Sequence, residues 1–385
     1  MTYNSTMRRR GVSAMLADRL RKVKSLMEKR GYECLFISPG PNQRYLTGTY
    51  YTYPGDAWDT IIAWDMITAG IIPLDGEPVL VVPKSSEDWV REISHIDDVR
   101  CYSGAKNRME ILKNLLGKVR GTLGMEDHLP FKIYEQLVAA FPQIKFKNAS
   151  DMLSEVRLIK SEEEIEYMRK AARIVENGVK VGREVIQESI TEKEISFEIE
   201  KAMRKSGAES ISYCVVQTGA NTATWNSPSE NRVKKGDFFL MDLSATYEGY
   251  HADITRMTAV GKPSEKQKKV YGVIQDAQLK AIDAIRDGVK AGVVNDAGRR
   301  VIDERGYGKY FPFGIGHGLG LEAHEIPHLT EFRDMEMELQ PGMVMTIEPT
   351  VNLPGEFGVR IEDDVLVTVG GRETLTTLGK ELVQI

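Results

Sequence analysis

Two acidic residues interrupt or follow an apolar stretch in the middle of the chain, where a charge is costly unless it is paired or bound to a metal. Asp242 lies inside the apolar run 238–243, and Asp253 comes eleven residues later. A turn centred between Tyr247 and Glu248 makes the two aspartates cross-strand neighbours, with Cβ atoms about 5 Å apart. Like charges at that distance repel, so we expect a cation between them.

A second hairpin near the end of the chain repeats this arrangement. An apolar strand ends in Glu348, and a second strand ends in Glu362. The midpoint between them is Gly355, next to Pro354, and Pro-Gly is a turn signal. We therefore expect this hairpin to present a second pair of facing carboxylates.

A glycine-rich segment, 314–325, lies between the two hairpins and contains His317 and His324. Four carboxylates and one imidazole suit a hard or borderline divalent ion such as Mn, Co, Fe or Zn. Four negative charges call for two ions, about 3.5–4 Å apart in the usual two-metal geometry. Each acid alone is typical of a surface hairpin, and a lone histidine is commonly structural. Their joint occurrence favours a site.

The order of the predicted helices and strands that position these residues changes near residue 150. Short strands and helices alternate over 1–150, which predicts an α/β domain. Over 151–385, helices that begin with capping boxes precede strands, and this order occurs twice, at about 150–260 and 261–370. Duplicated halves that face one another create a cleft, which is a common place for a site.

The composition excludes several classes of function. The chain has 385 residues and a net charge of −5, so we expect no nucleic-acid partner. No window approaches 18 continuous apolar residues, so we expect no membrane span. Cys34, Cys101 and Cys214 form no CxxC motif, which predicts reduced thiols and a cytoplasmic location.

Four motifs in the second part of the chain resemble those of the M24, or pita-bread, metallopeptidase family, which includes aminopeptidase P, prolidase, methionine aminopeptidase and creatinase. The motifs are MDLSATYEGYHADITR, GIGHGLGLEAHE, MTIEP and VRIED. The first part, including PNQRYLTG at 41–48, resembles the N-terminal domain of the aminopeptidase P, prolidase and creatinase branch, which methionine aminopeptidases lack. The resemblance implies a creatinase/prolidase-type α/β N-terminal domain, followed by an α+β pita-bread catalytic domain with pseudo-twofold duplicated halves.

The resemblance also implies a ligand set for two divalent ions, Mn or Co first and Zn or Fe as alternatives. Matched by motif, the ligands are Asp242, Asp253, His317, Glu348 and Glu362. A hydroxide between the ions would attack an amide carbonyl, and Glu348 would relay the proton of the water. His324 would bind the substrate or the tetrahedral intermediate, and Arg360 and Thr255 would hold the ligands. For Arg360, a cross-strand surface pair is the alternative.

The chain departs from the family pattern around the substrate. Xaa-Pro peptidases usually carry a histidine soon after a G-x-N segment, where this chain has Trp225 and Asn226. Many members have a histidine four residues before the metal histidine, where this chain has Phe313. We therefore predict a more apolar substrate pocket, lined by Trp225, Phe313 and Arg360.

Three functions compete. The leading hypothesis is a metallopeptidase that cleaves Xaa-Pro bonds, of the aminopeptidase P or prolidase type. The alternative is a metal-dependent enzyme on a small non-peptide substrate: a creatinase-like C–N hydrolase or a dimethylsulfoniopropionate lyase. In that case the aromatic side chains of the pocket would bind a cationic group of the substrate. A non-catalytic binding module should have lost its metal ligands, and this chain keeps all five.

The resemblance implies a homodimer in which the N-terminal domain of one subunit lies near the site of the other. The aromatic segment 50–58 is a candidate for the lip of that site, or else a packed loop.

Overall fold

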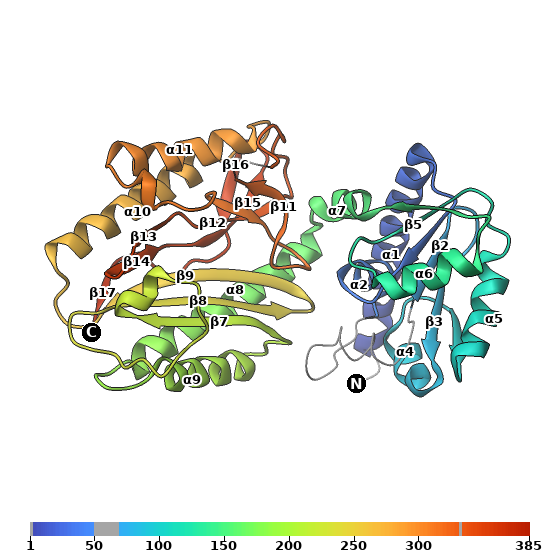
Figure 1. Cartoon of the computed structure of the whole chain (residues 1–385), viewed down its shortest axis with the longest axis horizontal. Coiled ribbons are helices and arrows are strands. Elements are labelled where there is room, and N and C mark those ends of the chain that lie inside the picture. Colours follow the sequence, from blue (N-terminus) through green and yellow to red (C-terminus); the bar gives the residue numbers. More distant parts are fainter. Residues whose placement is uncertain (1–2, 50–68, 331–332) are drawn as a thin grey trace. The chain divides into compact units, whose positions relative to one another are not determined.

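The chain divides into two compact units, Met1–Val156 and Arg157–Ile385. The structure, a computed structural model, describes residues 3–49, 69–330 and 333–385 (Figure 1). The aromatic segment 50–58 lies outside the described residues. Each unit has its own hydrophobic cores.

The N-terminal unit is built around a mixed six-stranded sheet of order β4-β3-β2-β1-β5-β6. Its strands are β1 (Cys34–Ile37), β2 (Ala69–Pro73), β3 (Val79–Pro83), β4 (Asp98–Tyr102), β5 (Thr122–Met125) and β6 (Lys145–Asn148). Its helices are α1 (Tyr3–Arg30), α2 (Pro41–Thr47), α4 (Glu87–Ile93), α5 (Ala105–Leu116), α6 (Phe131–Ala140) and α7 (Ser150–Leu158), which spans the boundary. The predicted α/β class is confirmed. The helix α2 was not predicted, because Pro41 follows Pro39 and Gly40 and so indicates a turn; proline also suits the first turn of a helix.

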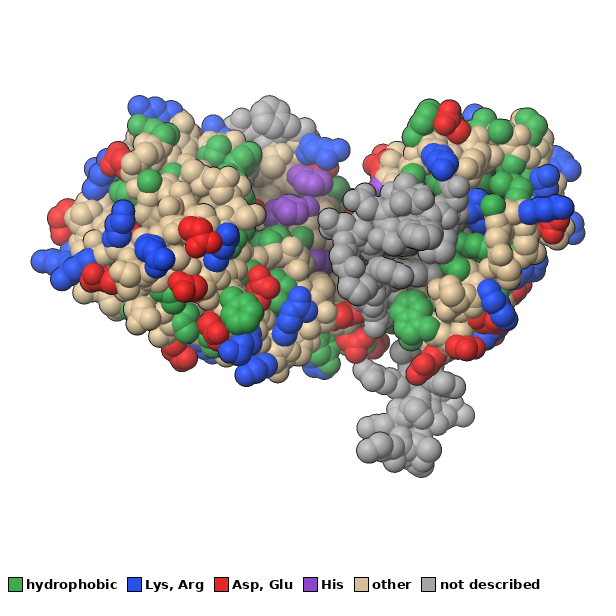
Figure 2. All heavy atoms as spheres, turned by 60° about the horizontal axis from the view of Figure 1, so that its bottom comes forward, with side chains coloured by type: hydrophobic (Ala, Val, Ile, Leu, Met, Phe, Trp, Pro, Cys, Tyr) green, Lys and Arg blue, Asp and Glu red, His purple; other side chains and the backbone are tan. Residues whose placement is uncertain are grey.

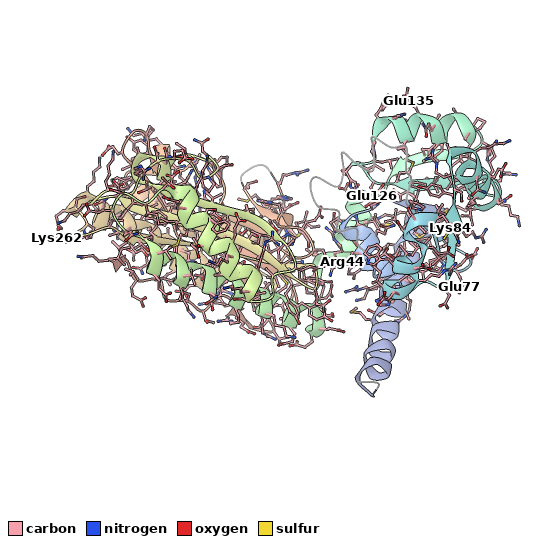
Figure 3. The ribbon with its side chains drawn as sticks, turned by 90° about the horizontal axis from the view of Figure 1, so that it is seen from below. Arg44, Glu77, Lys84, Glu126, Glu135 and Lys262 are labelled. Atoms are coloured by element: carbon pink, nitrogen blue, oxygen red, sulfur yellow. The ribbon has the colours of Figure 1, made fainter. Side chains whose placement is uncertain are left out.

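A buried carboxylate fastens the carboxyl ends of two parallel strands in this unit. Glu126, which follows β5, accepts hydrogen bonds from the backbone N–H of Ser38 (2.5 Å) and the amide of Asn42 (2.7 Å). Ser38 follows β1, and Asn42 lies in α2. The acid therefore joins the turn after β1 to the end of β5 (Figure 3).

The C-terminal unit contains two helix pairs and three sheets, ordered β17-β9-β8-β7, β11-β10-β12-β15-β16 and β13-β14. Its helices are α8 (Glu162–Val185), α9 (Glu192–Lys205), α10 (Glu265–Ala284) and α11 (Ala291–Glu304). Its strands are β7 (Ile211–Thr218), β8 (Phe238–Tyr247), β9 (Tyr250–Ala259), β10 (Gly316–Gly318), β11 (Glu325–Leu329), β12 (Val344–Ile347), β13 (Thr350–Leu353), β14 (Phe357–Arg360), β15 (Asp363–Thr368), β16 (Gly371–Thr374) and β17 (Val383–Gln384). The predicted capping boxes are present at Ser161, Thr191 and Ser264.

The two helix pairs lie on opposite sides of the strands (Figure 1). Alternate residues of β8 point to opposite faces, as a strand requires. Phe239, Met241 and Leu243 join the core with α8 and α9, whereas Phe238 and Leu240 join the core with α10, β13 and β14. Asp242 alternates with the second set, so it faces the second half of the unit.

The register of the first hairpin differs from the prediction. Asp242 pairs with Thr255, and Asp253 pairs with Ser244, so the two aspartates are diagonal neighbours and do not lie directly opposite. The turn lies at Glu248 and Gly249, both with positive φ (49° and 81°), one residue later than predicted. A two-residue turn of this kind favours a glycine, and its twist matches that of the strands. Both aspartates still lie on the same face of the sheet.

The second hairpin turns at Gly355, as predicted, and keeps one register along its length. It is not continuous, however. The ladder between β13 and β14 stops at Thr350 and Arg360, and the ladder between β12 and β15 begins at Ile347 and Asp363. Glu348 and Glu362 lie in this interruption, so neither residue takes part in the strand pairing of either sheet.

Candidate metal centre

Five side chains from both halves of the C-terminal unit converge on one buried place. They are Asp242 on β8, Asp253 on β9, His317 on β10, Glu348 after β12 and Glu362 after β14. Asp242, Asp253, Glu362 and His317 are 3%, 0%, 1% and 7% exposed. One ligand atom from each of Asp253, His317 and Glu362 lies within 4.8 Å of the others, which is close enough to hold a metal ion.

Hydrogen bonds orient two of the carboxylates and leave one oxygen without a protein partner. The Thr255 hydroxyl donates to Glu362 Oε2 (2.7 Å), and the Tyr213 hydroxyl donates to Asp253 Oδ2. Asp253 Oδ1 is buried and has no hydrogen-bond partner among the described residues. A buried oxygen in this state is costly unless an ion or water satisfies it.

The tautomer of His317 follows from its neighbours. Its Nδ1 lies 3.0 Å from the carbonyl oxygen of Gly318, which can only accept, so Nδ1 carries the proton. Nε2 then faces Glu348 Oε1 at 3.2 Å. Burial lowers the pKa of His317, but Glu348 outweighs burial and raises it, so in the metal-free protein a proton on Nε2 makes this contact an ion pair. Without that proton, Nε2 would be the ligand atom that a metal-binding histidine needs.

The carboxylates of the centre disfavour one another's charge. Burial raises the pKa of Asp242 to about 6, although Arg360 opposes the shift. Burial, with the charge of Asp242, raises the pKa of Asp253 well above its usual value, and burial with Asp253 does the same for Glu362. A bound cation would supply the missing positive charge.

The pKa of Glu348 shifts in the other direction. Burial would raise it, but the hydrogen bond and charge of His317, followed by Arg360, outweigh burial and lower it. Glu348 is therefore the carboxylate of the candidate centre that is most readily ionised in the metal-free protein.

Arg360 lies between the carboxylates and the aromatic residues of the predicted pocket. Its Nη1 pairs with Asp242 Oδ2, and its Nε lies 3.9 Å from Glu348 Oε2. The guanidinium stacks on Trp225, 3.7 Å from the ring centroid. Phe313 meets Trp225 edge to face, with centroids 5.6 Å apart. The alternative of an exposed surface pair for Arg360 is wrong, because its side chain is 6% exposed.

His324 lies beside the centre. Its ring centroid is 4.2 Å from that of His317, and burial, then the charge of His317, lowers its pKa. One side of His324 is covered and the other is open to solvent, so it is more exposed than His317, which is buried. Histidine side chains gather on one part of the surface of the C-terminal unit in Figure 2. On the same face, acidic and basic side chains are interspersed.

Sequence reasoning missed two polar residues of the centre. Tyr213 pairs with Ser244, which pairs with Asp253, so only the three-strand register reveals that its hydroxyl reaches the acid. Asp364 is fully buried, and its Oδ2 accepts the backbone N–H of Asp253 (3.0 Å). In the sequence, the run of three acidic residues at 362–364 was the sign that could have pointed to Asp364.

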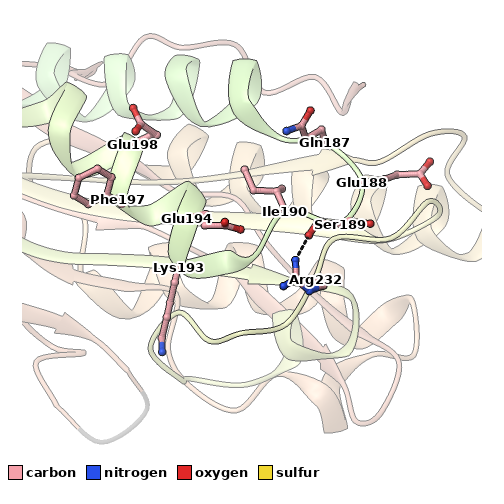
Figure 4. Close-up of a pocket in the computed structure, with 9 residues that line it drawn as sticks. All are labelled: Gln187, Glu188, Ser189, Ile190, Lys193, Glu194, Phe197, Glu198 and Arg232. Carbon is pink, nitrogen blue, oxygen red and sulfur yellow. Dashed lines mark hydrogen bonds between the residues drawn. The ribbon is translucent and has the colours of Figure 1, made fainter.

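A separate pocket of about 690 Å³ lies beside the first turns of α9 (Figure 4). Its walls include Lys193, Phe197 and Arg232, and Arg232 donates to the carbonyl of Ser189 (2.5 Å). The lining contains none of the five converging residues, so this pocket is not the metal centre.

The described helices include none that is both long and apolar enough to cross a membrane.

Comparison with known proteins agrees with this geometry. The profile of "Metallopeptidase family M24" matches residues 166–369, and that of "Creatinase/Prolidase N-terminal domain" matches residues 19–159. An Xaa-Pro dipeptidase from Pyrococcus horikoshii is 33% identical over 372 residues, which cover 96% of this chain and 99% of the relative. One from Pyrococcus furiosus is 34% identical over 371 residues, covering 96% and 100%.

Solved structures agree with this comparison. The prolidase of Thermococcus sibiricus superimposes with a TM-score of 0.88 at 32% identity, covering 95% of this chain and 98% of that one. The chain therefore belongs to metallopeptidase family M24, with a creatinase/prolidase N-terminal domain ahead of a catalytic domain of the pita-bread fold.

Proposed function

We propose that this protein is a metal-dependent dipeptidase that hydrolyses Xaa-Pro dipeptides, the prolidase type of activity. The observation that carries the proposal is the convergence of four carboxylates and the Nε2 of His317 on one buried place. Relatives named Xaa-Pro dipeptidases, which match this chain over nearly its whole length, support the substrate class.

The described residues fit a pair of divalent ions. Asp253 Oδ1 has no hydrogen-bond partner in the described part of the chain, and the raised pKa values of Asp253 and Glu362 reflect an excess of buried negative charge. Asp242, Asp253, His317, Glu348 and Glu362 would hold the ions. An oxygen-rich set with one imidazole favours Mn or Co. Bound there, divalent ions would polarise a peptide carbonyl and lower the pKa of a water molecule.

Side chains of the protein would transfer the proton, bind the reacting oxygen and position the metal ligands. Glu348, which lies beside Nε2 of His317, would accept the proton of the attacking water and pass it to the leaving nitrogen of proline. His324 would donate a hydrogen bond to the oxygen on which charge develops. Tyr213 and Thr255 would keep Asp253 and Glu362 in place.

The non-peptide alternative is not favoured. It needs a free aromatic face for a cationic group, but the Arg360 guanidinium already covers a face of Trp225 at 3.7 Å. A second cation near Arg360 would meet repulsion.

Two further features belong to the proposal. The resemblance to prolidases supports a homodimer, which light scattering on the purified protein will test. Three free cysteines, of which Cys34 and Cys214 are buried, support a reducing, cytoplasmic location.

The test is hydrolysis of Xaa-Pro dipeptides and Xaa-Pro-Yaa tripeptides by metal-stripped protein to which Mn or Co is returned. We expect metal-dependent cleavage of Leu-Pro, with dipeptides cleaved faster than tripeptides. Asp253→Ala should lose the activity, because it removes a proposed ligand.

The surface variant Asp276→Ala is the matched control, because Asp276 is a half-exposed acid of α10. It should keep full activity. Metal binding without cleavage of any Xaa-Pro peptide would rule out the proposed substrate class.

A further inference from the structure

Contacts outside the strand pairing hold the backbone of Glu362, the proposed ligand that lies between β14 and β15. Its N–H donates to the carbonyl of Thr255 (3.2 Å), and its carbonyl accepts from Nη1 of Arg256 (2.6 Å). A hydrogen bond from a charged donor is about twice as strong as one between neutral groups. Arg256 is therefore the main contact that holds the backbone of a residue outside both ladders.

Arg256 has little freedom to move, because it is fully buried and each nitrogen of its guanidinium donates a hydrogen bond. Nη2 donates to Asp363 Oδ1 (2.7 Å) and to the carbonyl of Leu378 (2.6 Å). Nε donates to the carbonyl of Gly379 (3.1 Å), and Nη1 also donates to that of Thr255 (3.0 Å). The guanidinium thus joins the candidate metal centre to a segment close to the end of the sequence.

Asp363 fixes this guanidinium with a carboxylate that is itself fully bonded. The residue is 0% exposed. Its Oδ1 accepts from Arg256 and from the Thr376 hydroxyl (2.7 Å). Its Oδ2 accepts from the Gln278 amide (2.7 Å) and pairs with Nζ of Lys380 (2.7 Å). A carboxylate has about four lone-pair sites, so these donors hold it in one orientation.

Helices from both halves of the unit hold the segment 376–380, which supplies two of these donors. On one side, the backbone N–H of Leu378 donates to the buried carboxylate of Glu176 on α8 (2.9 Å). On the other, the carbonyl of Lys380 accepts from the Tyr271 hydroxyl on α10 (2.7 Å). The two helices lie on opposite sides of the strands (Figure 1). The segment is therefore anchored independently of the candidate metal centre.

We propose that the segment 376–380 positions Glu362 for metal binding. It acts through the buried ion pair of Arg256 and Asp363. The inference rests on the proposed function, in which Glu362 is a metal ligand. The threonine and the lysine of the segment are positioning residues, because they contact the acid of the ion pair and act on the ligand through that pair. Loss of a group that holds a metal ligand typically weakens metal binding by roughly 10- to 100-fold.

The variant Thr376→Val tests this role in the full-length protein, because it removes the hydroxyl and nearly keeps the shape of the side chain. The hydroxyl also accepts the backbone N–H of Asp364 (3.1 Å), so two contacts are lost. We expect Mn to bind about tenfold more weakly, as measured by competition with a chelator. The conservative variant Thr376→Ser keeps the hydroxyl and should restore the Kd of the wild type.

The visible absorption spectrum of the Co-loaded protein gives a second measurement, because it depends on the arrangement of the ligands. It should change in Thr376→Val and match the wild type in Thr376→Ser. Lys380→Met is the second variant. The Lys380 side chain is 21% exposed, so its loss disturbs the fold less than that of a buried donor. It should weaken Mn binding in the same direction.

The matched control is Thr47→Val in the N-terminal unit. Thr47 is also buried, and its hydroxyl donates to the carbonyl of Gln43 (2.7 Å). Its loss should lower the Tm but leave the Kd for Mn and the Co spectrum unchanged. This control separates a general loss of stability from displacement of a metal ligand.

The outcomes separate the inference from the function on which it rests. An unchanged Kd and Co spectrum in both Thr376→Val and Lys380→Met would overturn the positioning role. Equal weakening of Mn binding in Thr376→Ser, or in Thr47→Val, would overturn it as well. A wild type that binds no Mn would overturn the proposed function, and the inference with it.

Discussion

At the scale of single residues, Asp253 is held on two sides by its neighbours. It is fully buried, its Oδ2 accepts from Tyr213, and its backbone N–H is bound by Asp364. Its other carboxylate oxygen has no partner among the described residues. Burial of this charge without a partner is costly, and an ion bound there would supply the partner that the oxygen lacks.

Asp253→Asn should separate these two effects. The amide keeps the shape but removes a buried charge, so the metal-free variant should melt at a higher temperature than the metal-free wild type at pH 8. Each kcal/mol gained corresponds to roughly 2–4 °C in Tm for a domain of this size. The variant should bind less metal, as measured by elemental analysis. Asp276→Asn, on the surface, should change neither property, and an unaltered metal content in Asp253→Asn would contradict the ligand assignment.

The pH dependence of the metal-free protein follows from the raised pKa values of Asp242, Asp253 and Glu362. A group whose pKa is higher in the folded state stabilises the fold fully below its unfolded pKa, about 4, and this contribution is lost as pH rises through the folded pKa. For Asp242 that value is about 6.

The Tm of the metal-free protein should therefore fall between pH 5 and pH 8 in a chelator. The increase in Tm caused by Mn should grow over the same range, because fewer protons must leave the ligands. Differential scanning fluorimetry measures both quantities. A metal-free Tm that rises across this range would show that the carboxylates do not control stability.

At the scale of elements, the short strand β10 holds His317 by close backbone contact. A Cβ at Gly316 would lie 1.9 Å from the carbonyl oxygen of Thr346, and one at Gly318 would lie 2.2 Å from that of Ile326. The glycines of the segment 314–320 therefore allow the backbones of three strands to approach closely.

Gly316→Ala should displace β10 and lower the free energy of unfolding by at least about 2 kcal/mol, because backbone atoms cannot move aside as a side chain does. Metal content should fall with it, because His317 moves. Gly272→Ala is the matched control: it lies within α10 with no heavy atom within 4 Å of its would-be Cβ. There alanine should stabilise the helix by up to about 1 kcal/mol. Denaturant unfolding of both variants measures these changes; equal stabilities would contradict the close contact.

At the scale of the whole molecule, each of the two units has its own cores, and all five residues of the centre belong to Arg157–Ile385. A ligand stabilises the part that binds it, by about 2.7 kcal/mol at one hundred times its Kd. Calorimetry should therefore show two transitions, of which Mn raises one by roughly 5–10 °C. A chelator should reverse the shift. A single transition that Mn shifts as a whole would mean that the two units unfold as one.

Local patterns in the sequence were sufficient for the α/β class of the first unit, the three capping boxes and the turn at Gly355, whereas the α+β class of the second unit came from the family resemblance. These local features depend on residues a few positions apart, whose preferences act without the rest of the fold. The motifs were sufficient to identify the family, because they place particular residue types at fixed spacings.

The tertiary structure decided what depends on register and on contacts between distant segments. A turn at Glu248 and Gly249 moved the two aspartates from opposite to diagonal positions, because a shift of one residue changes every cross-strand pair. Tyr213 reaches Asp253 across an intervening strand, and Arg360 covers Trp225 from a segment more than a hundred residues away. Such contacts exist only after both halves have packed together, so no local pattern encodes them.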